Sequence, residues 1–178
     1  MILQDIFHYF CKYPSTAAIE NYFTKNGEVP MDYSIMKAKA LDHADGKFPQ
    51  ITDYIFGVNE EQVKLKISQV KDIYMFIDYG NITSRTNNLN VKEDSMQLAL
   101  TIAKPLSSGS YDQAEELLIT EQLLEIITAI RNDLREDRTD PFVKRLSFPN
   151  DITPFFAREL SNSYGWTLMF QMSGTDMV

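Results

Sequence analysis

The 178-residue sequence predicts an α+β protein in which one long helix packs on a mainly antiparallel sheet. Large apolar side chains alternate with smaller or polar ones in residues 73–80, 95–104 and 164–172, as in strands. Apolar residues at helical spacing run through residues 111–135. A hydrophobic fraction of 44% allows a core of ordinary size for a chain of this length.

Residues 1–27 predict a helical arm, followed by a single α+β domain over residues 28–178. Apolar side chains at three- and four-residue spacing indicate a first helix that ends at Pro14. A second short helix follows the N-cap candidate Ser15 and closes at residues 26–27. The aromatic arm either packs on its own domain or docks on a neighbouring copy, and the sequence leaves both possibilities open.

The segment from residue 30 to residue 58 has the weakest pattern of the chain. Residues 33–41 fit a helix or a strand equally well. Residues 51–56 then predict a short strand that stops at Gly57.

A short helix is favoured after Asn59, which is a good N-cap with Gln62 as its reciprocal partner. The apolar residues that follow at helical spacing are Val63, Ile67 and Val70. A strand with Val63, Leu65 and Ile67 on one face is the alternative. The cap and the late lysines favour the helix.

The two strands 73–80 and 95–104 are joined by a polar loop, which predicts that they are antiparallel neighbours. The second strand has a large apolar face and a small face, the latter formed by Gln97, Ala99, Thr101 and Ala103. Ser110 and Gln113 form a candidate capping box for the helix 111–135, which we expect to lie on that small face. Its apolar stripe is widened by Leu117 and Leu124.

The C-terminal part predicts a proline-started turn of helix followed by a last strand. Residues 151–154 read Asp-Ile-Thr-Pro and precede two phenylalanines, which favours the helical turn. The strand 164–172 then alternates large residues with smaller ones.

The composition excludes several classes of function. A formal net charge of −8 argues against a general affinity for nucleic acid or acidic membranes, because the net field repels polyanions. One cysteine, Cys11, allows no intramolecular disulfide, and no apolar run approaches the roughly 20 residues that span a bilayer. These features predict a cytoplasmic protein, or a virion component, without a membrane partner.

Few residues are candidates for chemistry. Asp78 is the one acid in an apolar strand and is a candidate acid or base, although capping of the following turn is the simpler interpretation. His43 lies in an acidic segment that fails the calcium-loop spacing, so a turn is favoured over a metal ligand. On the first helix, Cys11 is interpreted as a small buried hydrophobe and His8 as a solvent-facing or packing residue. Phosphate-binding and nucleophile-elbow motifs do not occur, so we assign no catalytic, cofactor or metal residue.

The segments 77–82, 98–103 and 164–170, with the order of elements around them, resemble the strands of small tail-terminator and tail-completion proteins of tailed phages and prophages. The resemblance covers mainly residues 70–172 and rests on pattern. It implies a non-enzymatic subunit that forms a ring with copies of itself at the end of a tail tube. Exposed charged loops such as 84–94 and 131–140 would then contact neighbouring virion proteins.

Three functional hypotheses follow. The first is a non-enzymatic structural or assembly protein that acts through protein–protein surfaces and needs no cofactor. It would bind copies of itself, as a homo-oligomer, and other assembly proteins. The alternative is a monomeric module that binds a small molecule or peptide in a pocket with a few polar groups. The third is an enzyme that uses Asp78 beside a second ionisable group.

Overall fold

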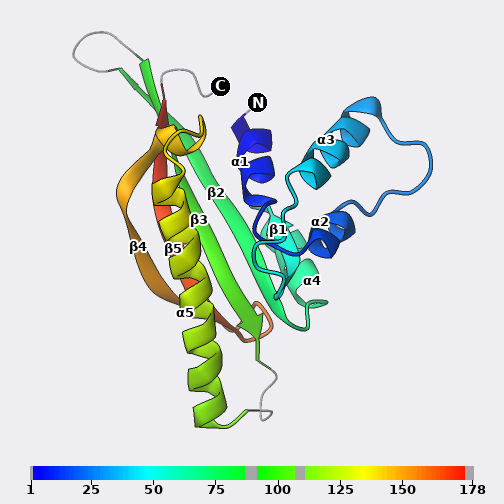
Figure 1. Ribbon diagram of the computed structural model, residues 1–178, viewed down its shortest axis with the longest axis vertical. Coiled ribbons are helices and arrows are strands. Elements are labelled where there is room, and N and C mark those ends of the chain that lie inside the picture. The colour runs from blue at the N-terminus through cyan, green and yellow to red at the C-terminus, as the bar shows by residue number, and fades with distance from the viewer. Residues whose placement is uncertain (1, 87–91, 107–110, 175–178) are drawn as a thin grey trace.

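The computed structural model describes residues 2–86, 92–106 and 111–174 and has an α+β fold (Figure 1). The described strands form one sheet in the order β1-β2-β3-β5-β4. Their bounds are β1 Ile51–Phe56, β2 Ile73–Thr86, β3 Lys92–Pro105, β4 Leu146–Ala157 and β5 Ser163–Gly174. The helices are α1 Ile2–Phe10, α2 Thr16–Tyr22, α3 Met31–Asp42, α4 Glu60–Ile67 and α5 Gln113–Glu136, with a 3₁₀ turn η1 at Val143–Arg145.

The sheet is mixed, although all but one of its strand pairs are antiparallel. β1 pairs with β2 in parallel, while β2–β3, β3–β5 and β4–β5 are antiparallel. The parallel pair follows from α4, because the chain must cross over before a second strand can run in the same direction. The predicted α+β class is therefore confirmed, with one parallel pair added to the expected antiparallel sheet.

β2 and β3 form a long hairpin that projects past the rest of the sheet, at the upper left of Figure 1. Both strands are longer than predicted. The expected turn after Tyr79 is a register shift between Tyr79 and Ile82, after which the ladder continues to Thr86. A bulge of this kind bends the strand and moves the following side chains to the other face. The alternation of apolar and polar residues is interrupted there, so it does not predict that the strand continues.

α5 lies on the large apolar face of β3, so the prediction that it covers the small face is wrong. Its buried residues join the core cluster that contains Leu98, Leu100 and Ile102 of β3. A wide stripe of leucine and isoleucine buries more apolar area against these side chains than against alanine and threonine. The small face is covered only in part, by α4, whose Val63 and Ile67 pack with Ala103.

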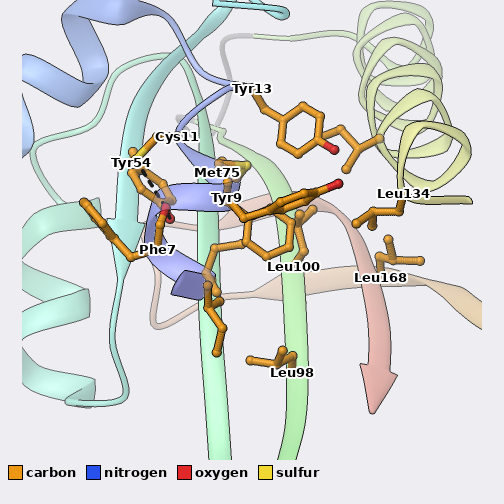
Figure 2. Close-up of a cluster of buried hydrophobic side chains, with 14 of the residues drawn as sticks. Phe7, Tyr9, Cys11, Tyr13, Tyr54, Met75, Leu98, Leu100, Leu134 and Leu168 are labelled. Atoms are coloured by element: carbon orange, nitrogen blue, oxygen red, sulfur yellow. Dashed lines mark hydrogen bonds between the residues drawn. The ribbon is translucent and has the colours of Figure 1, made fainter. Parts of the chain in front are cut away.

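α1 is buried in the same core as the sheet and lies beside α5 (Figures 1 and 2). Ile6, Phe7 and Phe10 are fully buried, and the Tyr54 hydroxyl of β1 donates a hydrogen bond of 3.1 Å to the Phe7 carbonyl. Of the two possibilities left open for the arm, α1 packs on its own domain. Whether residues 1–27 form a separate folding unit stays a prediction.

Two short helices resolve the ambiguous segments. Residues 33–41 belong to the helix α3, and the helix favoured after Asn59 is confirmed as α4. The Asn59 side chain accepts a hydrogen bond of 3.0 Å from the Gln62 amide, as the cap predicts.

Two sequence predictions on the C-terminal half are wrong. The cap of α5 is Asp112, whose side chain accepts from the amide of Glu115 while the Glu115 side chain accepts from the amide of Asp112. The predicted cap Ser110 lies outside the described residues. The expected helical turn at 151–154 is part of β4, an edge strand of the described sheet, where a proline is tolerated more readily than in a central strand.

Candidate functional site

A polar network ties α1 to the C-terminal end of α5. The Tyr9 hydroxyl donates to the Asp137 carboxylate at 3.1 Å, and the Tyr13 hydroxyl donates to Asp133 at 2.8 Å. Lys12 reaches the same Asp137 oxygen at 2.9 Å. The partners of each bond are at least 120 positions apart in the chain, so the sequence did not reveal their pairing.

The network combines two tyrosine hydroxyls with the side chains of Asp133, Asp137, Lys12 and Lys47. Partial burial by itself would raise the pKa of Asp133, but hydrogen bonds from Lys47 and Tyr13 and the nearby lysine charges outweigh it and lower the pKa. Burial raises the pKa of Tyr9 and Tyr13 far above that of a free tyrosine, so both remain donors. The arrangement therefore joins α1 and the residues that follow it to the C-terminal end of α5.

Beside this network lies a cleft of about 440 Å³, lined by α1, α3 and the segment from Asp137 to Arg145. We call it the α1–α3 cleft. Its volume falls in the range of small-ligand sites. Its walls combine apolar side chains, including Ile2 and Phe142, with acidic, basic and imidazole groups.

The two histidines of the chain meet at this cleft, although the sequence treats them as unrelated. Their ring centroids are 6.2 Å apart. His8 is only 4% exposed, and its Nε2 lies 3.3 Å from the Met36 carbonyl oxygen. Because a carbonyl oxygen only accepts a hydrogen bond, Nε2 carries the proton of the neutral ring and Nδ1 is unprotonated. Nδ1 has no hydrogen-bond partner among the described residues. Burial lowers the pKa of His8, which favours this neutral form.

Two of the other sequence-predicted candidates, Asp78 and Cys11, do not line this cleft, whereas His43 does. Asp78 is exposed on the small face of the sheet, where partial burial raises its pKa and a backbone hydrogen bond from Tyr79 opposes the rise. It does not cap a turn, since β2 continues past it. His43 caps the end of α3 with its backbone amide. Cys11 is fully buried as predicted, and its thiol donates to the Phe7 carbonyl at 3.2 Å.

A second feature, on the surface, is the first part of α5. Leu117 and Leu118 are 66% and 65% exposed, although the sequence assigns Leu117 to the buried stripe. The first buried residue of α5 is Leu123. Figure 1 shows the reason: α5 begins beyond the end of the sheet, so its first turns have no strand beneath them. Helical spacing alone predicts a face but not the length of the surface that covers it.

Comparisons with protein-family models, curated proteins and solved structures find no match to this chain. No described helix is long and apolar enough to cross a membrane. Among the residues that the structure describes, no group of three or more histidine, cysteine or acidic side chains is placed to hold a metal ion.

Proposed function

We propose that this protein is a non-enzymatic structural or assembly protein that binds copies of itself through exposed helix surfaces. The observation that carries the proposal is the projecting part of α5, residues 113–122, which we call the α5 overhang. It is about 15 Å long at 1.5 Å per residue. It presents two neighbouring leucines to solvent.

The α5 overhang is held in place by the body of the protein. The indole Nε1 of Trp166 donates a hydrogen bond of 3.0 Å to the carbonyl oxygen of Thr120, near the edge of the packed region. The capping box at Asp112 and Glu115 closes the free end of the helix. An apolar surface on a rigid, capped helix is typical of a protein–protein contact, because little conformational entropy is lost when it binds.

The charges around the leucines select the kind of contact. The acids of the overhang are Glu115, Glu116 and Glu121, and the N-cap Asp112 stands directly before it. Two overhangs packed on each other around a twofold axis would bring these carboxylates together, and like charges at such a contact cost binding energy. A contact with a different surface of the next copy avoids this repulsion.

α3 is the surface we assign to that contact. Met31 and Ile35 are 78% and 54% exposed and lie four residues apart, on one face of the helix. The acids of α3 are balanced by Lys37 and Lys39, so α3 does not repel the overhang. Figure 1 places α3 at the upper right and the start of α5 at the lower end of the molecule, well apart. A contact between two such different surfaces is head to tail, and it closes into a ring if the rotation allows. A ring is also what the resemblance to tail-terminator proteins implies, for a prophage tail or neck subunit.

Disulfide trapping tests the contact directly. A Leu118→Cys variant and an Ile35→Cys variant are mixed and oxidised, and the products are separated by mass. We expect the mixed dimer to exceed either homodimer, because the overhang of one copy lies on α3 of the next. The native Cys11 does not interfere, since it is fully buried.

The matched control is Glu136→Cys, at the exposed opposite end of the same helix. It should give no more mixed dimer with Ile35→Cys than random collision gives. A dominant Leu118→Cys homodimer would refute the head-to-tail arrangement, and no enrichment of any dimer would refute the α5 overhang as the interface.

A further inference from the structure

We propose that the α1–α3 cleft is a binding site for a small organic anion, with its oxyanion at Lys39 and Arg145 and its apolar part against Ile2 and Phe142. All four residues line the cleft. This site uses Lys39 of α3, whereas the self-association proposed above uses Met31 and Ile35 of the same helix. The binding test below does not require that contact to form.

The carboxylates of the cleft are already occupied. Asp137 accepts from Tyr9 and Lys12. Asp140 accepts from the backbone amides of Phe142 at 2.7 Å and Val143 at 3.4 Å. Asp5 is also engaged and is not free to take a cation. The acidic groups therefore have little capacity left for a positively charged ligand.

The basic groups differ in this respect. Lys12 is committed to Asp133 and Asp137. Lys39 and Arg145 form no ion pair with any described residue, and both are exposed at the cleft. An Arg guanidinium binds the oxygens of a carboxylate or phosphate in a bidentate manner, and a Lys ammonium adds a point charge. The unused binding capacity of the cleft is thus for an anion.

The apolar wall determines the rest of the ligand. Ile2 and Phe142 are buried side chains that nevertheless face this cavity, and Pro141 continues the wall. A volume of about 440 Å³ holds more than a bare inorganic ion. A ligand with a ring or short alkyl body beside its acid group uses both the wall and the cations.

The test uses the full-length protein and three probes of similar size: phenyl phosphate, benzoate and the neutral benzyl alcohol. Binding is followed by amide chemical shifts during a titration. We expect saturable shifts centred on Ile2, Lys39 and Phe142 with one or both anions, and at least tenfold weaker binding of benzyl alcohol. Comparison of phenyl phosphate with benzoate identifies which acid group the site prefers.

The double variant Lys39→Gln with Arg145→Gln should weaken the anion at least tenfold, as expected for the loss of charge-assisted hydrogen bonds. The matched control is Lys37→Gln with Lys144→Gln, which removes the same charge from neighbouring positions outside the cleft. It should change the affinity less than twofold. The proposal is overturned if neither anion saturates, if benzyl alcohol binds as well as the anions, or if both double variants behave alike.

Discussion

A methyl group added at Gly165 should strongly destabilise the folded protein. Gly165 lies in β5 opposite Ala103 of β3. A Cβ added at Gly165 would stand 2.0 Å from the Ile102 carbonyl oxygen and 2.7 Å from the Ala103 Cα, whereas real Cβ atoms stay beyond 3.0 Å. Both neighbours are backbone atoms, which cannot rotate away as the end of a side chain can.

The Gly165→Ala variant must therefore separate β3 from β5 locally. Forcing a methyl group into a packed core costs about 1–3 kcal/mol, and each ladder hydrogen bond lost on separation adds about 0.5–1.5 kcal/mol. We expect a loss of about 3–5 kcal/mol in the free energy of unfolding, a large part of the roughly 5–15 kcal/mol that stabilises an ordinary domain. The melting temperature should fall by about 6–20 °C.

Urea unfolding followed by circular dichroism measures this change, and Gly80→Ala is the matched control. A Cβ at Gly80 would meet the Gln97 carbonyl oxygen at 3.4 Å, an ordinary contact, so that variant should be neutral or more stable by up to about 1 kcal/mol. If Gly165→Ala unfolds within about 1 kcal/mol of the unmodified protein, the close approach of β3 and β5 is wrong.

Two further predictions concern α1 and its attachment. Asp133→Asn removes the carboxylate that accepts from Tyr13 and Lys47, and should cost about 1–2 kcal/mol at pH 7. The pKa of Asp133 is lower in the folded state than in the unfolded state. The ionised carboxylate therefore stabilises the fold above the unfolded-state pKa, and this stabilisation is lost as the pH falls through the folded-state pKa. Between pH 6 and pH 2 the free energy of unfolding should therefore decline less in the variant than in the unmodified protein. Burial raises the pKa of Cys11 to about 12, so Ellman's reagent should leave the native thiol unreacted for as long as the protein stays folded and label it at once in urea. Rapid labelling of the native protein would mean that α1 is not packed as described.

The sequence was most informative where periodicity and local chemistry agree. The alternating segments 73–80, 95–104 and 164–172 are strands, and the capped run after Asn59 is a helix. Both kinds of pattern depend on neighbours a few positions away, which the sequence displays directly.

The errors arose where partners are distant in the chain. β4 carries prolines that favour a helix start, and only its pairing with β5 makes it a strand. The face of β3 that α5 covers depends on packing between elements, and both faces satisfy a period of two.

The candidate sites were harder to predict than the fold. His8 and His43 looked unrelated because they lie 35 positions apart, and α1 and α3 bring them together. The cleft also needs the segment that follows α5, from Asp137 to Arg145. The exposure of Leu117 and Leu118 depends on where the sheet ends, which no local pattern encodes.

The central claim, self-association through the α5 overhang, is tested most directly by the mass of the protein in solution. A deletion of residues 1–27 is unsuitable for this purpose, because Ile6, Phe7 and Phe10 belong to the core. Exposed positions such as Leu117 and Leu118 can be changed with little effect on stability. The matched control is Leu65→Glu with Val58→Glu, which changes two other exposed apolar residues far from α5 in the chain.

Light scattering over a range of concentrations should give a multiple of 20.5 kDa for the unmodified protein and for the control. The variant Leu117→Glu with Leu118→Glu should give 20.5 kDa with an unchanged melting temperature. A monomer at every concentration, or an oligomer that the Leu117 and Leu118 changes leave intact, would contradict the account.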